Sequence, residues 1–176
     1  MELEKAILER RSIRQFSDRP VEQESLREIL KAAIWAPTGA NAQPWAFVCV
    51  TDPAAVHRIR VVSPGMFWDP KAVICVCSDQ RKAGRFKAGF DLARFDCAMA
   101  AQNAMLRAFS LGLGSCVIRS TNLEAVRLIL EAPDHIQPEL LVILGYPDGQ
   151  PKSPPRDPQV IYWQKYGNGE AHHERA

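Results

Sequence analysis

The sequence predicts one domain in which apolar strands and amphipathic helices alternate loosely, as in α/β and α+β proteins. The chain has 176 residues, of which 47% are hydrophobic and 24% charged, and these values are typical of one globular domain. Two continuous apolar runs, AVICVC at 72–77 and LLVILGY at 140–146, have the length of buried strands. A long segment of helical periodicity lies between them, so helices and strands are expected to share one core.

The other elements are predicted from shorter patterns of the same kinds. Helices are expected at 2–10, 22–35, 53–60 and 122–131. Further strands are expected at 45–50 and 115–118, with a strand-like piece, VIYW, at 160–163. The segment 147–158 holds five prolines and is not expected to be regular. We therefore predict a single domain over residues 1–167 and a disordered tail over 168–176.

A long helix is expected after the polar, basic loop at 79–89, and Gly112 and Gly114 are expected to stop it. Six of its residues, spaced three and four apart, form a seam: Leu92, Phe95, Met99, Gln102, Leu106 and Phe109. Such a seam is typical of a helix that packs against another helix, and one polar member often determines the register. Alanines beside the seam would let a partner helix approach closely. We expect this partner to be a second subunit, and the alternative is that the seam packs on its own chain.

Charge and cysteine content disfavour several classes of protein. The chain carries 22 Lys+Arg against 20 Asp+Glu, so neither nucleic acid nor an anionic membrane is an expected partner. The five cysteines are odd in number and lie mostly in apolar runs, which favours buried, reduced thiols. The charged N-terminus lacks a signal segment and no apolar run could span a bilayer, so a cytoplasmic location is expected.

Familiar catalytic and metal-binding patterns are missing from the sequence. The four histidines lack metal-ligand spacing, so no metal site is expected. No Ser/His/Asp or Cys/His arrangement for a nucleophile is evident. The first strand–helix connections lack G-x-G-x-x-G and G-x-x-x-x-G-K patterns, which disfavours a Rossmann or P-loop nucleotide site.

The segment Arg10-Arg11-Ser12-Ile13-Arg14 follows the first predicted helix. Its guanidinium groups match phosphate oxygens in bidentate geometry, and the serine adds a further donor. These residues are therefore candidates for binding a phosphate. The alternative is a solvated basic surface.

The loop APTGANAQPW at 36–45 follows the helix predicted at 22–35. It concentrates the side chains of Thr38, Asn41 and Gln43 and the bare backbone of Gly39. Such a loop can donate hydrogen bonds to the hydroxyls and carbonyls of a flat polar ligand. The alternative is a turn that ends a helix.

Two later clusters add weaker signals. In GLGSCVI at 112–118, glycines would let the backbone approach a ring closely, or they only end a helix before a strand. In KSPPR at 152–156, flanking prolines would make Arg156 a rigid donor, or the arginine is a solvated charge.

Together, and in this order, the four clusters resemble the nitroreductase family of flavin enzymes. RRSIRQF, APTGANAQPWAF, a long helix reaching GLGSC, and LGYP with a trailing PPR carry the resemblance, which runs from about Met1 to Gly167. It implies an α+β fold with a central mixed sheet flanked by helices, working as an intertwined homodimer with FMN in the interface. It also implies hydride transfer from NAD(P)H through flavin N5 to a small electron-poor acceptor, such as a nitroaromatic or a quinone.

The resemblance further implies which residues hold FMN. Those near its phosphate and ribityl chain would be Arg10, Arg11, Ser12 and Arg156. Arg14 would lie near the pyrimidine edge and stabilise the reduced flavin, and no side chain would perform the chemistry itself. Residues from the loop at 36–45 would be Pro37, Thr38 and Gly39 from the other subunit, with Asn41 and Gln43. Ile118 and Arg119 would pass their backbone amides near N5.

Three features depart from the family pattern. Arg119 and Ser120 stand where many members have an acidic residue and a glycine, and Val117 stands where many have tryptophan. The chain is also short for the family. These departures concern the acceptor more than the cofactor. The alternatives are a flavin-dependent dehydrogenase, deiodinase or flavin-destroying enzyme on the same fold, or a non-enzymatic module that binds a phosphorylated ligand.

Overall fold

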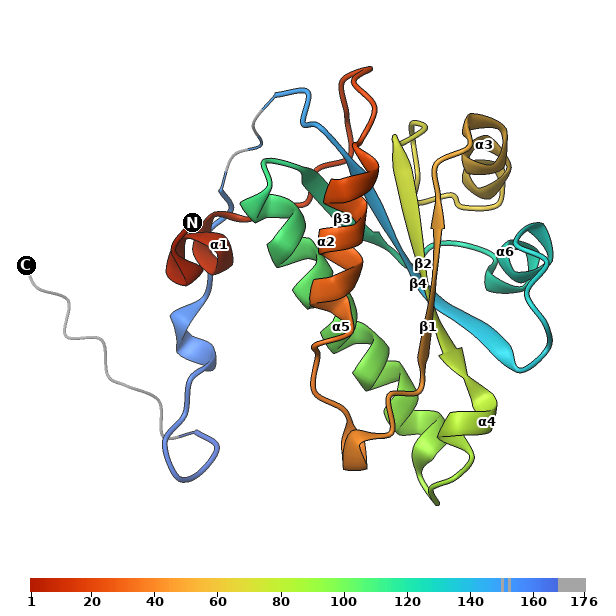
Figure 1. The fold of residues 1–176 in the computed structure, drawn as a ribbon. Coiled ribbons are helices and arrows are strands. Elements are labelled where there is room, and N and C mark those ends of the chain that lie inside the picture. The colour runs from red at the N-terminus through yellow and green to blue at the C-terminus, as the bar shows by residue number, and fades with distance from the viewer. Residues whose placement is uncertain (150, 152, 168–176) are drawn as a thin grey trace, which may run out of the picture.

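A four-stranded sheet lies between two layers of helices in the computed structural model, which describes residues 1–149, 151 and 153–167 (Figure 1). Its central strands, β2 (Ala72–Asp79) and β4 (Ile136–Gly145), are the most apolar segments and are buried along most of their length. The edge strands are β1 (Trp45–Val50) and β3 (Gly114–Ile118), in the order β1-β2-β4-β3. The α+β class predicted from the sequence is confirmed.

The four strands pair in antiparallel register throughout. The parallel pairing expected of a mixed sheet is limited to an isolated bridge between Ser12 and Ser115. This bridge brings the arginine segment to the outer edge of β3, although the two lie far apart in the sequence.

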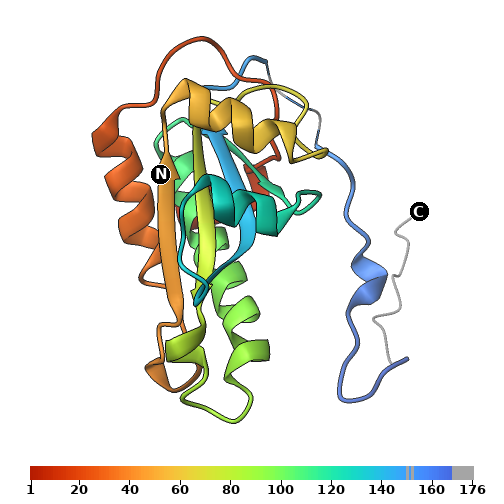
Figure 2. The ribbon, with the colours of Figure 1, turned by 90° about the vertical axis from the view of Figure 1, so that its right-hand side faces the viewer.

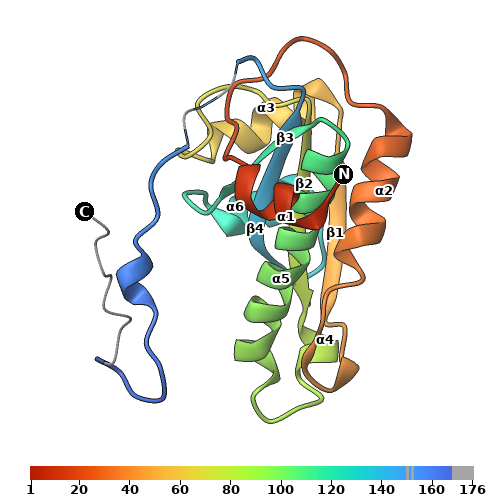
Figure 3. The ribbon, with the colours of Figure 1, turned by 90° about the vertical axis from the view of Figure 1, so that its left-hand side faces the viewer.

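Each face of the sheet is covered by a pair of helices (Figures 2 and 3). Helices α2 (Gln23–Ala33) and α5 (Gly89–Ser110) cover one face, and α3 (Pro53–Val61) and α6 (Leu123–Ile129) cover the other. Asp52 and Asn122 cap the N-termini of α3 and α6 by accepting from the backbone N–H three residues later. The short α1 (Leu3–Glu9) lies beside the end of α5.

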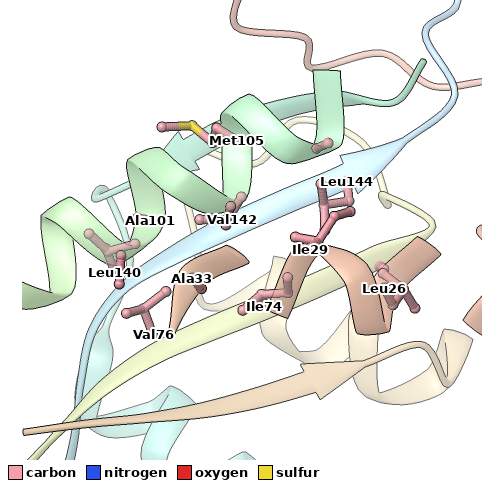
Figure 4. Packing of buried hydrophobic residues seen from close by; sticks show 14 of the residues in the cluster. Leu26, Ile29, Ala33, Ile74, Val76, Ala101, Met105, Leu140, Val142 and Leu144 are labelled. Carbon is pink, nitrogen blue, oxygen red and sulfur yellow. The ribbon is translucent and has the colours of Figure 1, made fainter. Parts of the chain in front are cut away.

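The larger core cluster lies between the sheet and the α2–α5 layer (Figure 4). Leu26 and Ile29 from α2 meet Ile74 from β2 and Leu144 from β4, and all four are buried. Burying side chains of this size stabilises the fold by about 1.5–3 kcal/mol each. The core therefore determines the positions of α2 and α5 relative to the sheet.

Helix α5 turns its alanines toward the sheet and its larger apolar residues outward. Ala93, Ala100, Ala104 and Ala108 are fully or almost fully buried within the chain, where small side chains let the helix lie close to the strands. The expectation that alanines beside the seam admit a helix of a second subunit is thus wrong for Ala101, Ala104 and Ala108, which are buried within the chain, whereas Ala98 is exposed. The seam from Leu92 through Phe109 faces outward instead, and Phe95 is 66% exposed.

Several element boundaries differ from those expected. The loop expected at 79–89 contains a short helix, α4 (Gln80–Ala83), capped by the carboxylate of Asp79. Strand β4 begins four residues before the expected 140 because pairing with β2 extends it. The strand-like piece expected at 160–163 begins inside the 3-10 turn η2 (Pro158–Val160). The tail expected to be disordered at 168–176, together with Gln150 and Lys152, lies outside the described residues.

The segment that follows α1 lies against two facing glycines. Gly114 of β3 and Gly145 of β4 are paired across the sheet, and Ile13 and Phe16 lie over them. A Cβ on Gly114 would lie 2.7 Å from the Cβ of Ile13, and one on Gly145 would lie 2.6 Å from the Cγ of Phe16. Carbon atoms pack at about 3.5–4.0 Å, so only glycine permits this approach. The backbone N–H of Ile13 also donates to the carbonyl oxygen of Ser115 at 2.9 Å.

A charged clamp joins the end of β4 to the entry of α2. The hydroxyl of Tyr146 donates to Glu22 at 2.6 Å, Arg19 pairs with Glu22 at 2.7 Å, and the Arg19 guanidinium lies 3.8 Å from the centre of the Tyr146 ring. The Tyr146 hydroxyl and then Arg19 lower the pKa of Glu22 from 4.5 to about 2.

We expect this clamp to contribute to acid sensitivity. Because the folded pKa lies below the unfolded one, the contribution is complete above about pH 4.5 and is lost as the pH falls toward 2. The difference between the urea midpoints of the wild type and Glu22→Gln should therefore shrink between pH 6 and pH 3. A difference that does not change with pH would contradict this account.

Candidate functional site

The arginine segment borders two hollows on the surface. One, of about 440 Å³, is lined by Arg10 and Arg11 together with Phe109 near the end of α5. The other, of about 300 Å³, is lined by Ser12 and Arg14. Both have the size of small-ligand sites. Arg10 and Arg11 thus line one hollow and Ser12 and Arg14 line the other, and their roles toward a cofactor stay predictions.

One buried polar atom beside the larger hollow, the Nε of Arg10, lacks a partner among the described residues. The buried hydroxyl of Ser115 in β3 also lacks one, but Ser115 lines neither hollow. A buried donor without an acceptor is costly, and it would be satisfied by a ligand that carries several oxygen atoms. A phosphate with its attached hydroxyl chain has that chemistry. The donors present thus fit the phosphate and ribityl part of FMN.

Arg11 has a different set of contacts from its neighbours. Its Nη1 donates to the carbonyl oxygens of Leu8 at 2.6 Å and Arg10 at 2.7 Å, and its Nη2 donates to Ser153. These bonds satisfy carbonyl groups at the end of α1 and join the C-terminal segment to it. Much of the donor capacity of Arg11 is thus used within the chain, and its role toward a phosphate stays a prediction.

The loop predicted to contact a flat ligand contains three residues in a strained backbone conformation. Ala40, Asn41 and Gln43 have φ angles of 49°, 52° and 46°, a left-handed region that residues with a side chain rarely occupy. Thr38 Oγ1 accepts from the backbone N–H of Gln43 at 3.2 Å. Strain of this kind in an exposed loop is a feature of ligand clamps.

This loop and the arginine segment do not meet within one chain. Gly39 shares a hollow of about 130 Å³ with Leu92 near the start of α5, whereas Arg10 shares its hollow with Phe109 near the end. A helix rises about 1.5 Å per residue, so Leu92 and Phe109 lie about 25 Å apart along its axis. Figure 3 shows η1 (Gly39–Asn41) beside α4 and the arginine segment at the far end of α5. One small ligand cannot touch both groups of the same chain.

The segment between α3 and β2 contributes a residue that the sequence analysis missed. Trp68 lines the hollow of about 300 Å³ with Ser12 and Arg14 and is half exposed. Its ring lies at a steep angle against that of Phe67, with 5.8 Å between ring centres. The signal that could have identified Trp68 in the sequence is the pair of neighbouring aromatic residues, Phe67 and Trp68, after a Pro-Gly turn.

The same segment is joined to the residues that follow β3. The N–H of Gly65 donates to the carbonyl oxygen of Ser120 at 3.0 Å, and the hydroxyls of Ser63 and Thr121 lie 2.7 Å apart. These contacts place the turn that carries Trp68 next to Ile118, whose Cγ2 would lie 3.3 Å from a Cβ on Gly65. The turn before Trp68 therefore packs on the residues at the end of β3, and the prediction that their backbone passes flavin N5 stays untested.

The structure leaves the roles predicted for the Arg119 backbone amide and the Arg156 side chain untested. The guanidinium of Arg119 donates to the backbone oxygen of Glu139, so this side chain is held beside β4. Arg156 is exposed in the extended segment after β4 and lines neither hollow beside the arginine segment. The roles proposed for both residues stay predictions.

Other chemistries find little support in the part of the chain that the structure describes. Within it, no group of three or more His, Cys, Asp or Glu residues could hold a metal ion, and no helix is long and apolar enough to cross a membrane. The cysteines are free, as predicted, and all but the half-buried Cys49 are buried. Burial raises the pKa of the thiols of Cys49 and Cys97, which disfavours reactive thiolates at these positions.

Comparisons with known proteins identify the family of this chain. The profile of the nitroreductase family matches residues 7–63 and 59–146. A protein of Archaeoglobus fulgidus, provisionally named NADH dehydrogenase/NAD(P)H nitroreductase, is 36% identical over 149 residues, which cover 81% of this chain and 84% of the relative. The FMN reductase (NADPH) of Bacillus subtilis is 28% identical, with coverage of 92% and 73%.

A solved structure of a nitroreductase has the same fold as this chain. The FMN-dependent nitroreductase from Clostridium difficile R20291 superposes with a TM-score of 0.82 at 28% identity, covering 92% of this chain and 98% of the other. The family profile spans most of the sequence, from the segment before the first arginine to the end of β4. The chain belongs to the nitroreductase family.

Proposed function

We propose that this chain is an FMN-dependent oxidoreductase that passes hydride from NAD(P)H to a small electron-poor acceptor such as a nitroaromatic or a quinone. One observation carries the proposal: the buried Nε of Arg10 has no partner among the described residues, and it lies beside a hollow of about 440 Å³. The names of the relatives, which include FMN and NAD(P)H, support the same reading.

The chain's own residues bind and orient the cofactor. FMN, when bound, supplies the hydride-transfer chemistry, as cofactors of this kind do. Arg10 and Ser12 would bind its phosphate and ribityl chain. Arg14 would place a fixed positive charge near the pyrimidine edge, where negative charge develops on reduction. Trp68 would cover the hollow lined by Ser12 and Arg14 and exclude water from it.

The site is proposed to form between two copies of the chain. The loop with Thr38 and Gly39 lies about 25 Å along α5 from the end that carries Arg10, so a second copy must supply one of the two. The outward-facing seam, with Leu92 44% and Phe95 66% exposed, offers an apolar surface for that copy. We therefore infer an obligate homodimer with two shared sites.

The proposal also places the enzyme in the cytoplasm. All five cysteines are free, and cysteine thiols persist in reducing compartments. Reduced nicotinamides, the expected electron donors, are available there.

The purified protein should be yellow and should lose its visible absorbance when NADH or NADPH is added without oxygen. Reoxidation by a nitroaromatic or a quinone should restore the colour. A protein that binds FMN but is bleached by neither nicotinamide would contradict the reductase function. A colourless protein that gains no flavin spectrum with added FMN would instead indicate a module for another phosphorylated ligand.

Gly145→Ala should weaken FMN binding by displacing the arginine segment, because the new Cβ would collide with Phe16. Val142→Ala is the matched control, since it weakens the buried centre of the same strand without touching the segment. FMN affinity and urea stability should both be measured. If both variants fold and bind FMN with equal affinity, glycine at position 145 is not needed to position the arginine segment for FMN binding.

Thr38→Ala and Arg10→Ala homodimers should each bind FMN weakly, because every site contains one altered residue. A heterodimer of the two should regain about one good site, since one site then has both wild-type halves. The readout is bound FMN per heterodimer after purification through two different tags. A flavin-loaded monomer in sedimentation at micromolar concentration would refute the shared site.

A further inference from the structure

Helix α5 presents polar residues to α2 and to the loop that follows α2. Arg107 pairs with Glu28 at 3.0 Å, and the Nδ2 of Asn103 donates to the backbone oxygen of Ala32 at 3.3 Å. Asp96 stands seven residues before Asn103 and therefore lies on the same face of the helix. This polar stripe, Asp96, Asn103 and Arg107, follows α2 along its length and continues past its end.

Asp96 is the member of the stripe that reaches the strained loop. It is only 4% exposed and shares the hollow of about 130 Å³ with Gly39 and Ala40. The backbone N–H of Gly39 interacts with its carboxylate and lowers the pKa of Asp96, whereas burial, the stronger effect, raises it. A buried carboxylate without a donor would be costly, so this contact holds both partners in place.

The strained loop requires contacts with the rest of the chain because its own backbone conformation is unfavourable. Asn41 and Gln43 both have positive φ angles, and such angles persist only where the surroundings impose them. The far end of the loop is held at Gln43, whose backbone oxygen accepts from Lys82 at 3.4 Å and whose N–H donates to Thr38. Asp96 lies at the near end, beside Gly39.

We propose that Asp96 is a positioning residue for the cofactor: through Gly39 it holds the strained loop in the shape that receives FMN bound by a second copy of the chain. This inference rests on the proposed function, since it assumes that the loop contacts FMN. The anchoring of Gly39 by Asp96, however, can be measured in the protein without cofactor. Asn103, which contacts only the end of α2, is the matched control in the same stripe.

The experiment compares the wild type with Asp96→Ala, Asp96→Asn and Asn103→Ala. In the flavin-free protein, the Gly39 amide should exchange with solvent about tenfold faster or more in Asp96→Ala, because its acceptor is gone. FMN affinity should also fall in this variant. Asp96→Asn keeps a carbonyl oxygen as acceptor and should largely restore both values. Asn103→Ala should alter urea stability but leave Gly39 exchange and FMN affinity close to the wild type.

The outcomes separate this inference from the proposed function. Unchanged Gly39 exchange and FMN affinity in a folded Asp96→Ala protein would overturn the positioning role. If Asn103→Ala loses as much protection of the Gly39 amide and as much FMN affinity as Asp96→Ala, the positioning role is also overturned, because such losses would indicate a general loss of stability. A wild type that binds no FMN would refute the proposed function, while Gly39 exchange would still test the anchor. If Asp96→Ala does not fold, Asp96→Glu serves instead, and its longer side chain should displace Gly39 and lower FMN affinity.

Discussion

The site depends on the contact of two side chains with two bare backbone positions. Ile13 and Phe16 lie directly on Gly114 and Gly145, which face each other across β3 and β4. Because Ile13 is held there, Arg10, Ser12 and Arg14 are presented around the hollows on either side of the segment. An arginine segment without this contact would be a flexible, solvated peptide. The close packing of apolar groups thus orders the charged groups.

Helix α5 connects the distant parts of the molecule. Its alanine face lies on the sheet, its polar stripe bonds to α2 and lines a hollow with the strained loop, and its larger apolar residues face outward. One end approaches the loop and the other approaches the arginine segment. A rigid helix of this length keeps the strained loop and the arginine segment apart in one chain, and this separation is the physical reason why we propose a site shared between two chains.

Much of the fold could be predicted because local patterns agree with the tertiary structure. The strands β1 and β2 and the helix α2 appear where apolar periodicity and proline positions placed them. The predictions failed where a distant partner decided the outcome: β4 is extended by its pairing with β2, and the alanines of α5 are covered by its own sheet. Trp68 was missed because its proximity to Ser12 and Arg14 arises from contacts between loops that are far apart in the sequence.

By itself, the sequence determined the main helices and strands and the residue types that suit a phosphorylated, flat cofactor, because these follow from short-range periodicity and side-chain chemistry. Periodicity left α/β and α+β both open, and the α+β class was implied by the family resemblance. Only the tertiary structure decided that Gly114 serves the approach of Ile13, that Arg11 holds the end of α1, and that Asp96 reaches the loop at Gly39. Each of these contacts joins residues whose proximity depends on how the layers pack. Packing is a property of the whole chain, so no local pattern specifies it.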